Sequence, residues 1–320
     1  MLTRRSFAVS LALSTVALPA RAADKDFSEW VKGVRRDAQA QGIAPATLDR
    51  ALADLAPIPR VVELDHRQPE TTLTFSEYID RVVSPQRREA ARARLNENRE
   101  LLDEVGAHYG VAPRFIVALW GIETDFGRVT GTFPVIAALA TLAYEGRRAA
   151  FFRNELMNAL KIVDRLHIDP RRMTGSWAGA MGQSQFMPSS FLTYAVSYRG
   201  ESAPDIWNRR DDVFASIANY LARVGWRGEG WGEAVRIPQG LDPAAESRPR
   251  PVAEWAALGV RRVDGSALAA GAGTAGLVAP QGLEGPIFLT YDNYRALLKW
   301  NNSSYFAIAV GYLADSMARR

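Results

Sequence analysis

The chain has 320 residues, 48% of them hydrophobic and 23% charged, which excludes a fibrous or wholly disordered protein and suits one large domain or two modest ones. Its formal charge is +4, but removal of residues 1–22 would take away three arginines and no acid, which leaves 4 − 3 = +1 and excludes the basic footprint of a nucleic-acid-binding protein. Cysteine is absent, which excludes disulfides, a thiol nucleophile, thiolate-bound metals and a lipidated cysteine.

Residues 1–22 have the pattern of an export signal. Arg4 and Arg5 precede an apolar run over 7–20, and residues 20–22 form an A-x-A-like cleavage site. The run is too short to remain as a membrane anchor, so we expect a mature, unanchored chain of residues 23–320. Residues 3–7 also resemble a twin-arginine signal, and the choice between Sec and twin-arginine export stays open.

The mature chain shows mainly helical periodicity up to about residue 240. Apolar side chains recur at helical spacing over 113–127, 148–166 and 213–224. Residues 241–285 are rich in Ala, Gly and Pro with short apolar runs, which predicts loops and short strands, and 286–290 is predicted to be a strand. Helical pattern returns over 293–317. We therefore predict a mainly α chain of the α+β class, divided into an N-terminal helical part (23–110), a core (111–240), an irregular or β insertion (241–290) and a C-terminal helical closure (291–320).

The predicted helix over 113–127 carries an acid in an apolar setting. Glu123 follows Phe115 and Leu119 by eight and four residues, so it lies on the apolar stripe. It is also close to Gly127, where the helix is expected to stop and where the helix dipole disfavours negative charge. Both features predict a raised pKa for Glu123, as a general acid requires. A structural carboxylate is the alternative interpretation.

Asp125 is the nearest acid along the chain to Glu123. Residues two apart on a helix point to different sides, so the two carboxylates cannot act as a pair across one bond while both are helical. We interpret Asp125 as a polar residue at the helix end.

The segment over 175–190 is rich in small residues and neutral polar groups. Glycine and alanine permit a close approach of the backbone to a ligand or to another element. Ser176, Gln183 and Gln185 offer the neutral donors and acceptors that suit sugar hydroxyls and acetamides. Tight packing between two helices would explain the small residues equally well. The three histidines show no metal-ligand spacing, and we expect neither a metal nor a cofactor.

Several long motifs occur in order along the chain. They are WGIETDFG at 120–127, ALATLAYEGRR at 138–148, GSWAGAMG at 175–182, QFMPSS at 185–190 and WNNSSY at 300–305. With these motifs the mature chain resembles the lytic murein transglycosylase B family, in its soluble periplasmic form, over essentially its whole length. The resemblance implies a lysozyme-like helical catalytic core flanked by helical and small β-containing subdomains, located in the periplasm and acting on peptidoglycan strands as a monomer.

The resemblance also implies roles for individual residues. Glu123 matches the catalytic glutamate of the family. Tyr78 and Arg148 are weaker matches to substrate-binding positions, and Trp300 stands where the family often has tyrosine, so an aromatic platform is kept without a phenol hydroxyl. The remaining matches to positions that line the saccharide cleft are Ser176, Gln185, Phe186, Tyr220 and Asn301.

The implied reaction needs only one carboxyl group. Glu123 would protonate the oxygen of the β-1,4 bond between N-acetylmuramic acid and N-acetylglucosamine, and then take a proton from the C6 hydroxyl as this attacks C1 to form 1,6-anhydro-N-acetylmuramic acid. Two alternatives remain. A lysozyme-type hydrolase would need a second carboxylate about 6.5–9.5 Å away to activate water with inversion, and a non-catalytic glycan-binding protein would need no acid at all.

Many members of the family carry an acidic, EF-hand-like loop at a position that matches residues 195–207. An EF-hand loop binds calcium through oxygen ligands at its first, third and fifth positions. In this chain the residues at these three positions are Ser197, Arg199 and Glu201, so Ser197 offers only a hydroxyl and Arg199 a cation. Pro204 also alters the backbone of this loop. We therefore predict a loop without metal, tied by a contact from Arg199 to Glu201 or Asp205.

Overall fold

The computed structural model describes residues 20–66, 73–200, 203–228, 230–244, 248–268 and 273–318, with the backbone alone for 20–25. The predicted export segment therefore lies outside the described residues except for its last three, which begin the first helix. In the part of the chain that is described, no helix combines the length and the apolar character needed to cross a bilayer.

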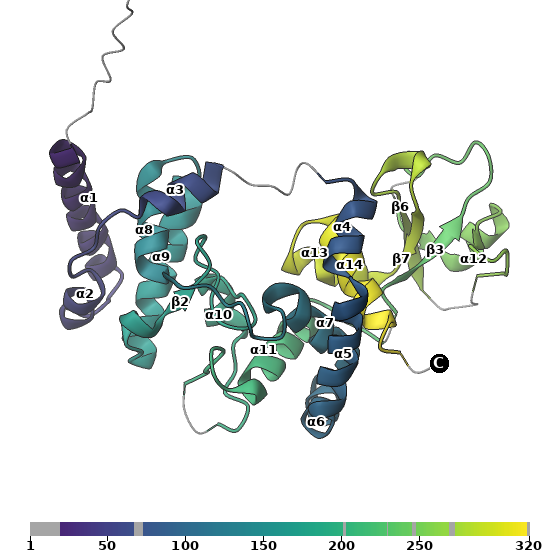
Figure 1. Ribbon diagram of the computed structural model, residues 1–320, viewed down its shortest axis with the longest axis horizontal. Coiled ribbons are helices and arrows are strands. Elements are labelled where there is room, and N and C mark those ends of the chain that lie inside the picture. The colour runs from purple at the N-terminus through teal and green to yellow at the C-terminus, as the bar shows by residue number, and fades with distance from the viewer. Residues whose placement is uncertain are drawn as a thin grey trace, which may run out of the picture.

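Fourteen α-helices and two small sheets make up the described fold, which confirms the predicted mainly α class (Figure 1). Two single-turn 3₁₀ helices, Pro170–Arg172 and Gly282–Glu284, lie in connections. The α-helices are α1 (Ala20–Ala40), α2 (Pro45–Ala51), α3 (Pro59–His66), α4 (Phe75–Val82), α5 (Pro85–Glu97), α6 (Arg99–Tyr109), α7 (Pro113–Thr124), α8 (Val135–Glu145), α9 (Ala149–Leu166), α10 (Pro188–Tyr194), α11 (Arg210–Arg223), α12 (Val252–Ala257), α13 (Asp292–Trp300) and α14 (Ser304–Asp315).

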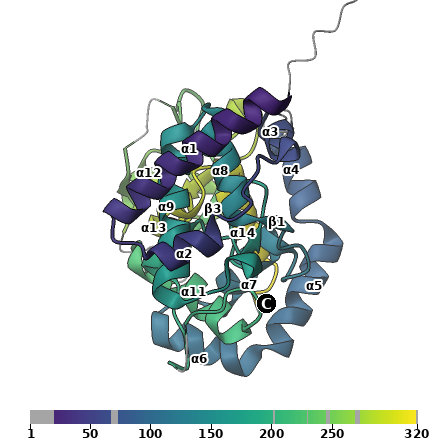
Figure 2. The same cartoon turned by 90° about the vertical axis from the view of Figure 1, so that its left-hand side faces the viewer.

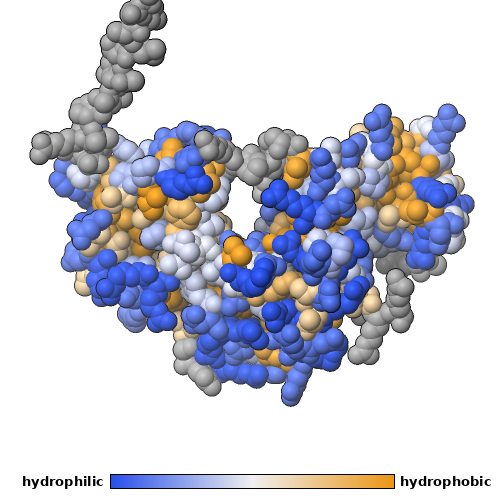
Figure 3. Space-filling model, in the orientation of Figure 1, coloured by the Kyte–Doolittle hydropathy of each residue, from blue (hydrophilic) through white to orange (hydrophobic). Residues whose placement is uncertain are grey.

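The antiparallel pair α8 and α9 forms one lobe together with the N-terminal helices. Helix α1 lies across this pair (Figures 1 and 2), where its Phe27 and Trp30 rings pack on Tyr144 of α8 with centroid distances of 5.1 and 5.7 Å. Helices α4, α5, α13, α14 and the larger sheet form the second lobe. Figure 3 shows that the surface is hollowed between the two lobes.

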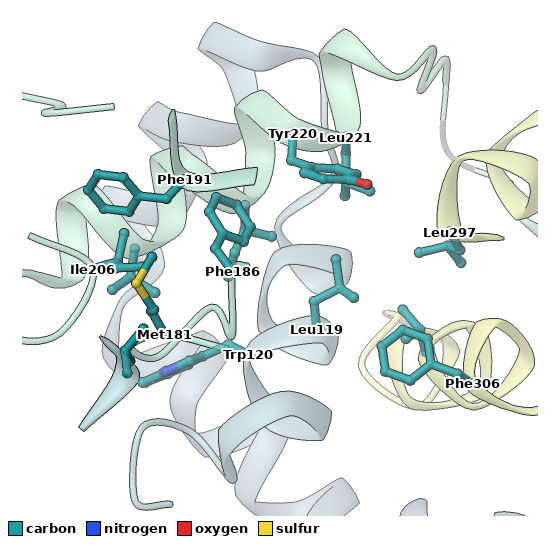
Figure 4. Packing of buried hydrophobic residues seen from close by; sticks show 14 of the residues in the cluster. Leu119, Trp120, Met181, Phe186, Phe191, Ile206, Tyr220, Leu221, Leu297 and Phe306 are labelled. Carbon is teal, nitrogen blue, oxygen red and sulfur yellow. The ribbon is translucent and has the colours of Figure 1, made fainter. Parts of the chain in front are cut away.

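Helix α7 lies at the junction of the lobes and is largely buried. Its residues from Phe115 to Gly121 are all buried, and α5, α6, α11 and α14 pack around it. Figure 4 shows this surround: Phe186 and Tyr220 lie on one side of α7 near Leu119, and Phe306 of α14 lies on another. A helix enclosed on all sides is a rigid support for a side chain at its end.

The larger sheet has the strand order β4-β6-β7-β3-β5, and every pair is antiparallel. Strand β7 (Ile287–Thr290) confirms the strand predicted over 286–290, and β6 (Thr274–Val278) is one of the short strands expected in the insertion. Strand β3 (Gly232–Arg236) lies inside the sheet, between β7 and β5, so the β part begins before residue 241. A small core around Trp255 holds it together. The other strands are β4 (Arg250–Pro251) and β5 (Arg261–Arg262), and the second sheet pairs β1 (Phe133–Pro134) with β2 (Thr174–Gly175).

The helical pattern predicted over 293–317 is two helices rather than one. Asn301 has an extended backbone (φ −142°, ψ 118°) and ends α13, and the side chain of Ser303 accepts a hydrogen bond from the Phe306 amide to begin α14. The break follows from capping chemistry, since asparagine and serine compete with the helix for backbone hydrogen bonds.

Candidate active site

Helix α7 ends in a left-handed turn immediately after Glu123. The helix stops at Thr124, three residues before the predicted stop, because Asp125 and Phe126 already have φ of 50° and 60° and Gly127 continues with 82°. The hydroxyl of Thr124 accepts from the Gly127 amide at 3.1 Å and donates to the Gln183 carbonyl at 2.9 Å. The turn therefore joins the end of α7 to the glycine-rich segment.

Glu123 is partly buried at the penultimate position of α7, on the face that also carries Phe115 and Leu119. Its Oε1 accepts a hydrogen bond of 2.7 Å from the indole N–H of Trp300, 177 residues later in the chain. This bond links the core helix to the end of α13. No feature of the sequence near either residue indicates it.

Asp125 faces a different set of partners. Its Oδ2 accepts from Nε of Arg128 at 2.8 Å, and its Oδ1 lies 3.8 Å from Nε of Arg87. The carboxylate thus balances two arginines at the helix end. This arrangement agrees with its interpretation as a polar helix-end residue.

The glycine-rich segment packs against the backbone of its neighbours. A Cβ on Gly175 would lie 2.1 Å from the Ala180 carbonyl oxygen, and one on Gly182, which has φ +63°, would lie 2.6 Å from the Ile206 carbonyl oxygen. The close approach expected of these glycines is therefore to protein backbone. Gln183 fastens the segment, since its Oε1 accepts from Trp120 of α7 at 2.9 Å and its Nε2 donates to the Trp207 carbonyl at 2.8 Å.

Three aromatic side chains gather beside Glu123. The Trp300 ring lies 4.7 Å from the Tyr220 ring and 5.3 Å from the Phe186 ring, between centroids. The hydroxyl of Tyr220 donates to the Lys299 carbonyl at 2.6 Å. Burial raises the pKa of Tyr220 to about 12, with a smaller contribution from Tyr194, so this hydroxyl remains a donor at any physiological pH. Phe186 and Tyr220 are buried, with 2% and 7% exposure, and they support Trp300 from behind.

The other residues predicted to bind substrate lie in four places. Ser176 and Gln185 belong to the segment next to α7: Ser176 Oγ accepts from the Ala180 amide at 3.1 Å, and Gln185 donates to the Thr130 and Gly182 carbonyls. Asn301 is exposed directly after Trp300. Tyr78 and Arg148 are on separate elements.

Tyr78 and Arg148 already have protein partners. The ring of Tyr78 lies 5.6 Å from that of Tyr305. Arg148 donates to Asp65 at 2.6 Å and covers the ring of Phe152. Asp65 is 1% exposed and is also paired with Arg147 at 2.9 Å. Sequence reasoning missed this acid, because nothing in a short helix marks one carboxylate as buried.

Two places in the described chain offer donor atoms for a cation. Asp65, His66 and Glu145 lie close enough to share one, but Arg147 and Arg148 already neutralise Asp65, which makes this cluster a poor fit.

The loop over 195–207 is the second such place. The predicted contact of Arg199 with Asp205 is wrong: Arg199 pairs with Glu104 of α6, with N–O distances of 3.0 and 3.3 Å. The alternative contact with Glu201 stays a prediction. Helix α6 packs along α11 and brings Glu104 within reach, and the hydrogen bond from Arg199, followed by that from Tyr198, lowers the pKa of Glu104. Glu201 lies outside the described residues. Asp205 accepts from the amides of Trp207 and Asn208. A hydroxyl and a guanidinium at the first and third positions do not fit a calcium site.

The ends of this loop are held by a buried acid. Asp212 of α11 is 0% exposed, and its two oxygens accept from the amides of Tyr198 at 2.7 Å and Asp205 at 2.9 Å. Because the Trp207 carbonyl holds Gln183 and Gln183 holds Trp120, Asp212 is connected to α7 through the protein itself.

Comparison with known proteins assigns the family. The model of the transglycosylase SLT domain matches residues 26–315. The membrane-bound lytic murein transglycosylase B of Escherichia coli (strain K12) is 30% identical over 277 residues, which are 80% of this chain and 73% of that protein. The crystal structure of SltB3 from Pseudomonas aeruginosa in complex with NAG-anhNAM-pentapeptide is 44% identical with a TM-score of 0.87, over 91% of this chain and 79% of that one. Soluble lytic transglycosylase SltB1 from the same organism is 31% identical with a TM-score of 0.78, over 92% and 98%. These matches confirm the lysozyme-like α+β fold class, and the chain belongs to the lytic murein transglycosylase B family.

Proposed function

We propose that Glu123 performs both proton transfers of a lytic transglycosylase reaction on peptidoglycan. The chain is an enzyme of this family, and the bond cleaved is the β-1,4 linkage between N-acetylmuramic acid and N-acetylglucosamine. The observation that carries the assignment of the residue is the position of Glu123, a partly buried acid at the end of a largely buried helix, held by a directed hydrogen bond from Trp300.

The reaction has two proton transfers. First, the neutral carboxyl of Glu123 donates its proton to the glycosidic oxygen as the bond breaks, and the 2-acetamido group of the muramic acid stabilises the positive charge that develops at C1. Second, the Glu123 carboxylate accepts the proton of the C6 hydroxyl as this oxygen attacks C1. The product carries a 1,6-anhydro ring and no water is consumed, so one protein carboxyl is enough, as in other substrate-assisted glycosidases.

The remaining predicted residues would bind the saccharide. The amide of Gln185, the hydroxyl of Ser176 and the exposed amide of Asn301 supply neutral donors and acceptors near α7 and α13. The exposed part of Trp300 would pack on a pyranose ring, with Phe186 and Tyr220 behind it. Tyr78 and Arg148 would act further from the cleaved bond.

A lysozyme-type hydrolase is the competing function. It requires a second carboxylate that activates water. Asp125, the acid nearest to Glu123 in sequence, is engaged by Arg128 and Arg87 and is poorly placed to bind and activate a water molecule, because its carboxylate oxygens are directed at these two guanidinium groups.

We also propose that the mature chain is exported by a Sec or twin-arginine signal over residues 1–22 and acts in the periplasm as a monomer. The charge pattern of these residues supports export. Fractionation of cells and the elution volume of the purified protein in size-exclusion chromatography test these two statements.

The test of the catalytic assignment uses two neighbouring acids. Glu123→Gln keeps the size of the side chain and should lower turnover of purified peptidoglycan by about 10²-fold or more, since general acid–base catalysis contributes about 10²–10⁴-fold. Asp125→Asn is the matched control, because asparagine adopts the left-handed conformation of this position more readily than most residues. It should keep near-normal turnover. A folded Glu123→Gln variant with normal turnover would refute the assignment.

A further inference from the structure

The hydrogen bond between Trp300 and Glu123 is directional. An indole N–H can donate a hydrogen bond but cannot accept one. The Oε1 atom of Glu123, 2.7 Å from this nitrogen, must therefore be an acceptor whether the carboxyl is neutral or charged. In the neutral form the carbonyl oxygen of a carboxyl group is the better acceptor, so the bond from the indole favours the tautomer whose hydroxyl is the other oxygen.

We propose that Trp300 is a positioning residue that assigns the acidic proton of Glu123 to Oε2 and keeps that oxygen in place for both proton transfers. The proposal rests on the catalytic role proposed above for Glu123. With Oε1 bound to the indole, Oε2 donates the proton to the glycosidic oxygen and the same atom then accepts the proton of the C6 hydroxyl. No rotation of the carboxyl group is needed between the two steps, which conserves the orientation on which proton transfer depends.

The position of the indole is itself determined by packing. Trp300 is the last residue of α13, and its ring is in contact with those of Tyr220 and Phe186, at 4.7 and 5.3 Å between centroids. The Tyr220 hydroxyl holds the carbonyl of the preceding residue, Lys299, at 2.6 Å. The backbone and the ring of Trp300 are therefore both restrained, so the N–H is aimed at Glu123 before substrate binds.

The choice of one carboxyl oxygen depends on having tryptophan at position 300. A tyrosine hydroxyl at this position could donate or accept, and would leave either carboxyl oxygen able to carry the proton. Tryptophan removes this ambiguity. In this proposal the buried rings of Phe186 and Tyr220 hold the indole of Trp300 in place, and they do not contact the sugar over a wide surface.

The kinetic test compares two substitutions of Trp300. Trp300→Phe keeps an aromatic ring against Tyr220 and Phe186 but removes the donor. We expect kcat to fall about 10- to 100-fold with KM changed much less, because a hydrogen bond to a charged group is lost while the apolar contact remains. In Trp300→His, the Nε2–H group is separated from Cβ by three bonds, as the indole N–H is, but the six-membered ring is missing. It should recover part of kcat while KM rises.

A second measurement does not depend on either Trp300 variant being active. In ¹H–¹⁵N spectra of the labelled full-length mature protein, the indole signal of Trp300 is the one missing in Trp300→Phe. Glu123→Ala should move this signal upfield, since the acceptor is lost, and Glu123→Gln should leave it near its original position because the amide oxygen can still accept. An unmoved signal in Glu123→Ala, or a Trp300→Phe variant with wild-type kcat, would overturn the positioning role. Loss of turnover in Glu123→Gln would still support the catalytic role of Glu123 if the positioning role of Trp300 were overturned. The two proposals can therefore fail separately.

Discussion

Asp212 offers a quantitative test of how the protein itself holds the loop after α10. Its fully buried carboxylate accepts the amides of Tyr198 and Asp205. In Asp212→Asn one oxygen is replaced by an NH₂ group, which faces a backbone N–H and leaves that buried donor without an acceptor. Leaving one buried donor unsatisfied costs about 1–3 kcal/mol, and the loss of negative charge 3.8 Å from Nε of Arg209 adds to this. We expect a loss of roughly 2–4 kcal/mol in the free energy of unfolding.

The assay is thermal unfolding followed by circular dichroism. For a chain of this size 1 kcal/mol corresponds to about 2–4 °C, so the Tm of Asp212→Asn should fall by roughly 4–16 °C. The matched control is Asp211→Asn, next in the chain, where a partly exposed ion pair with Arg209 at 3.1 Å is lost. That pair contributes about 1 kcal/mol or less, so its Tm should change by only a few degrees. Equal Tm values for Asp212→Asn and the wild type would refute the idea that this carboxylate holds the loop.

Three further predictions concern the backbone, the metal and the signal. Gly182→Ala should destabilise the protein by about 2 kcal/mol or more in denaturant titrations, because it combines a left-handed φ with a clash against the Ile206 carbonyl, whereas Gly200→Ala, with φ +73° and open space around it, should cost about 1 kcal/mol; equal losses would contradict the clash. Calorimetric titration with calcium should show no micromolar binding and a chelator should not lower the Tm, because Ser197 and Arg199 supply no carboxylate at the first and third ligand positions; a clear micromolar affinity would show the opposite. Replacing Arg4 and Arg5 together by lysine should block export if the twin-arginine pathway is used, and an unchanged periplasmic yield would assign the signal to the Sec pathway.

Local periodicity was sufficient to predict α7, α9 and α11, but it did not show the break between α13 and α14. The apolar spacing that leads to Glu123 indicated α7, and Arg148 lies at the N-cap of α9 where the predicted helix over 148–166 begins. The composition shift at Gly240 indicated a β part but not its first strand, because β3 is short and only Val235 of its five residues is buried. The strands of the larger sheet come from both sides of Gly240. Their pairing is long-range, and a local sequence pattern does not indicate it.

In the site, too, local features were predictable from the sequence and long-range contacts were not. The sequence indicated Glu123, the glycine-rich segment and the aromatic Trp300 as separate features. It could not indicate that Trp300 donates to Glu123, or that Arg199 pairs with Glu104, because these contacts join residues 177 and 95 positions apart. Such contacts depend on how helices pack, and long polar side chains can reach several alternative partners from one backbone position.

The central claim is that Glu123 directs an intramolecular attack by the C6 hydroxyl rather than an attack by water. The most direct measurement is mass spectrometry of the saccharides that the purified mature enzyme releases from peptidoglycan, with reducing ends counted in the same digest. We expect products one water lighter than the hydrolysed muropeptides, ending in 1,6-anhydro-N-acetylmuramic acid, with no new reducing ends. These products should be absent from digests with Glu123→Gln. Products ending mainly in reducing N-acetylmuramic acid would contradict it and would assign the chain to the lysozyme-type hydrolases.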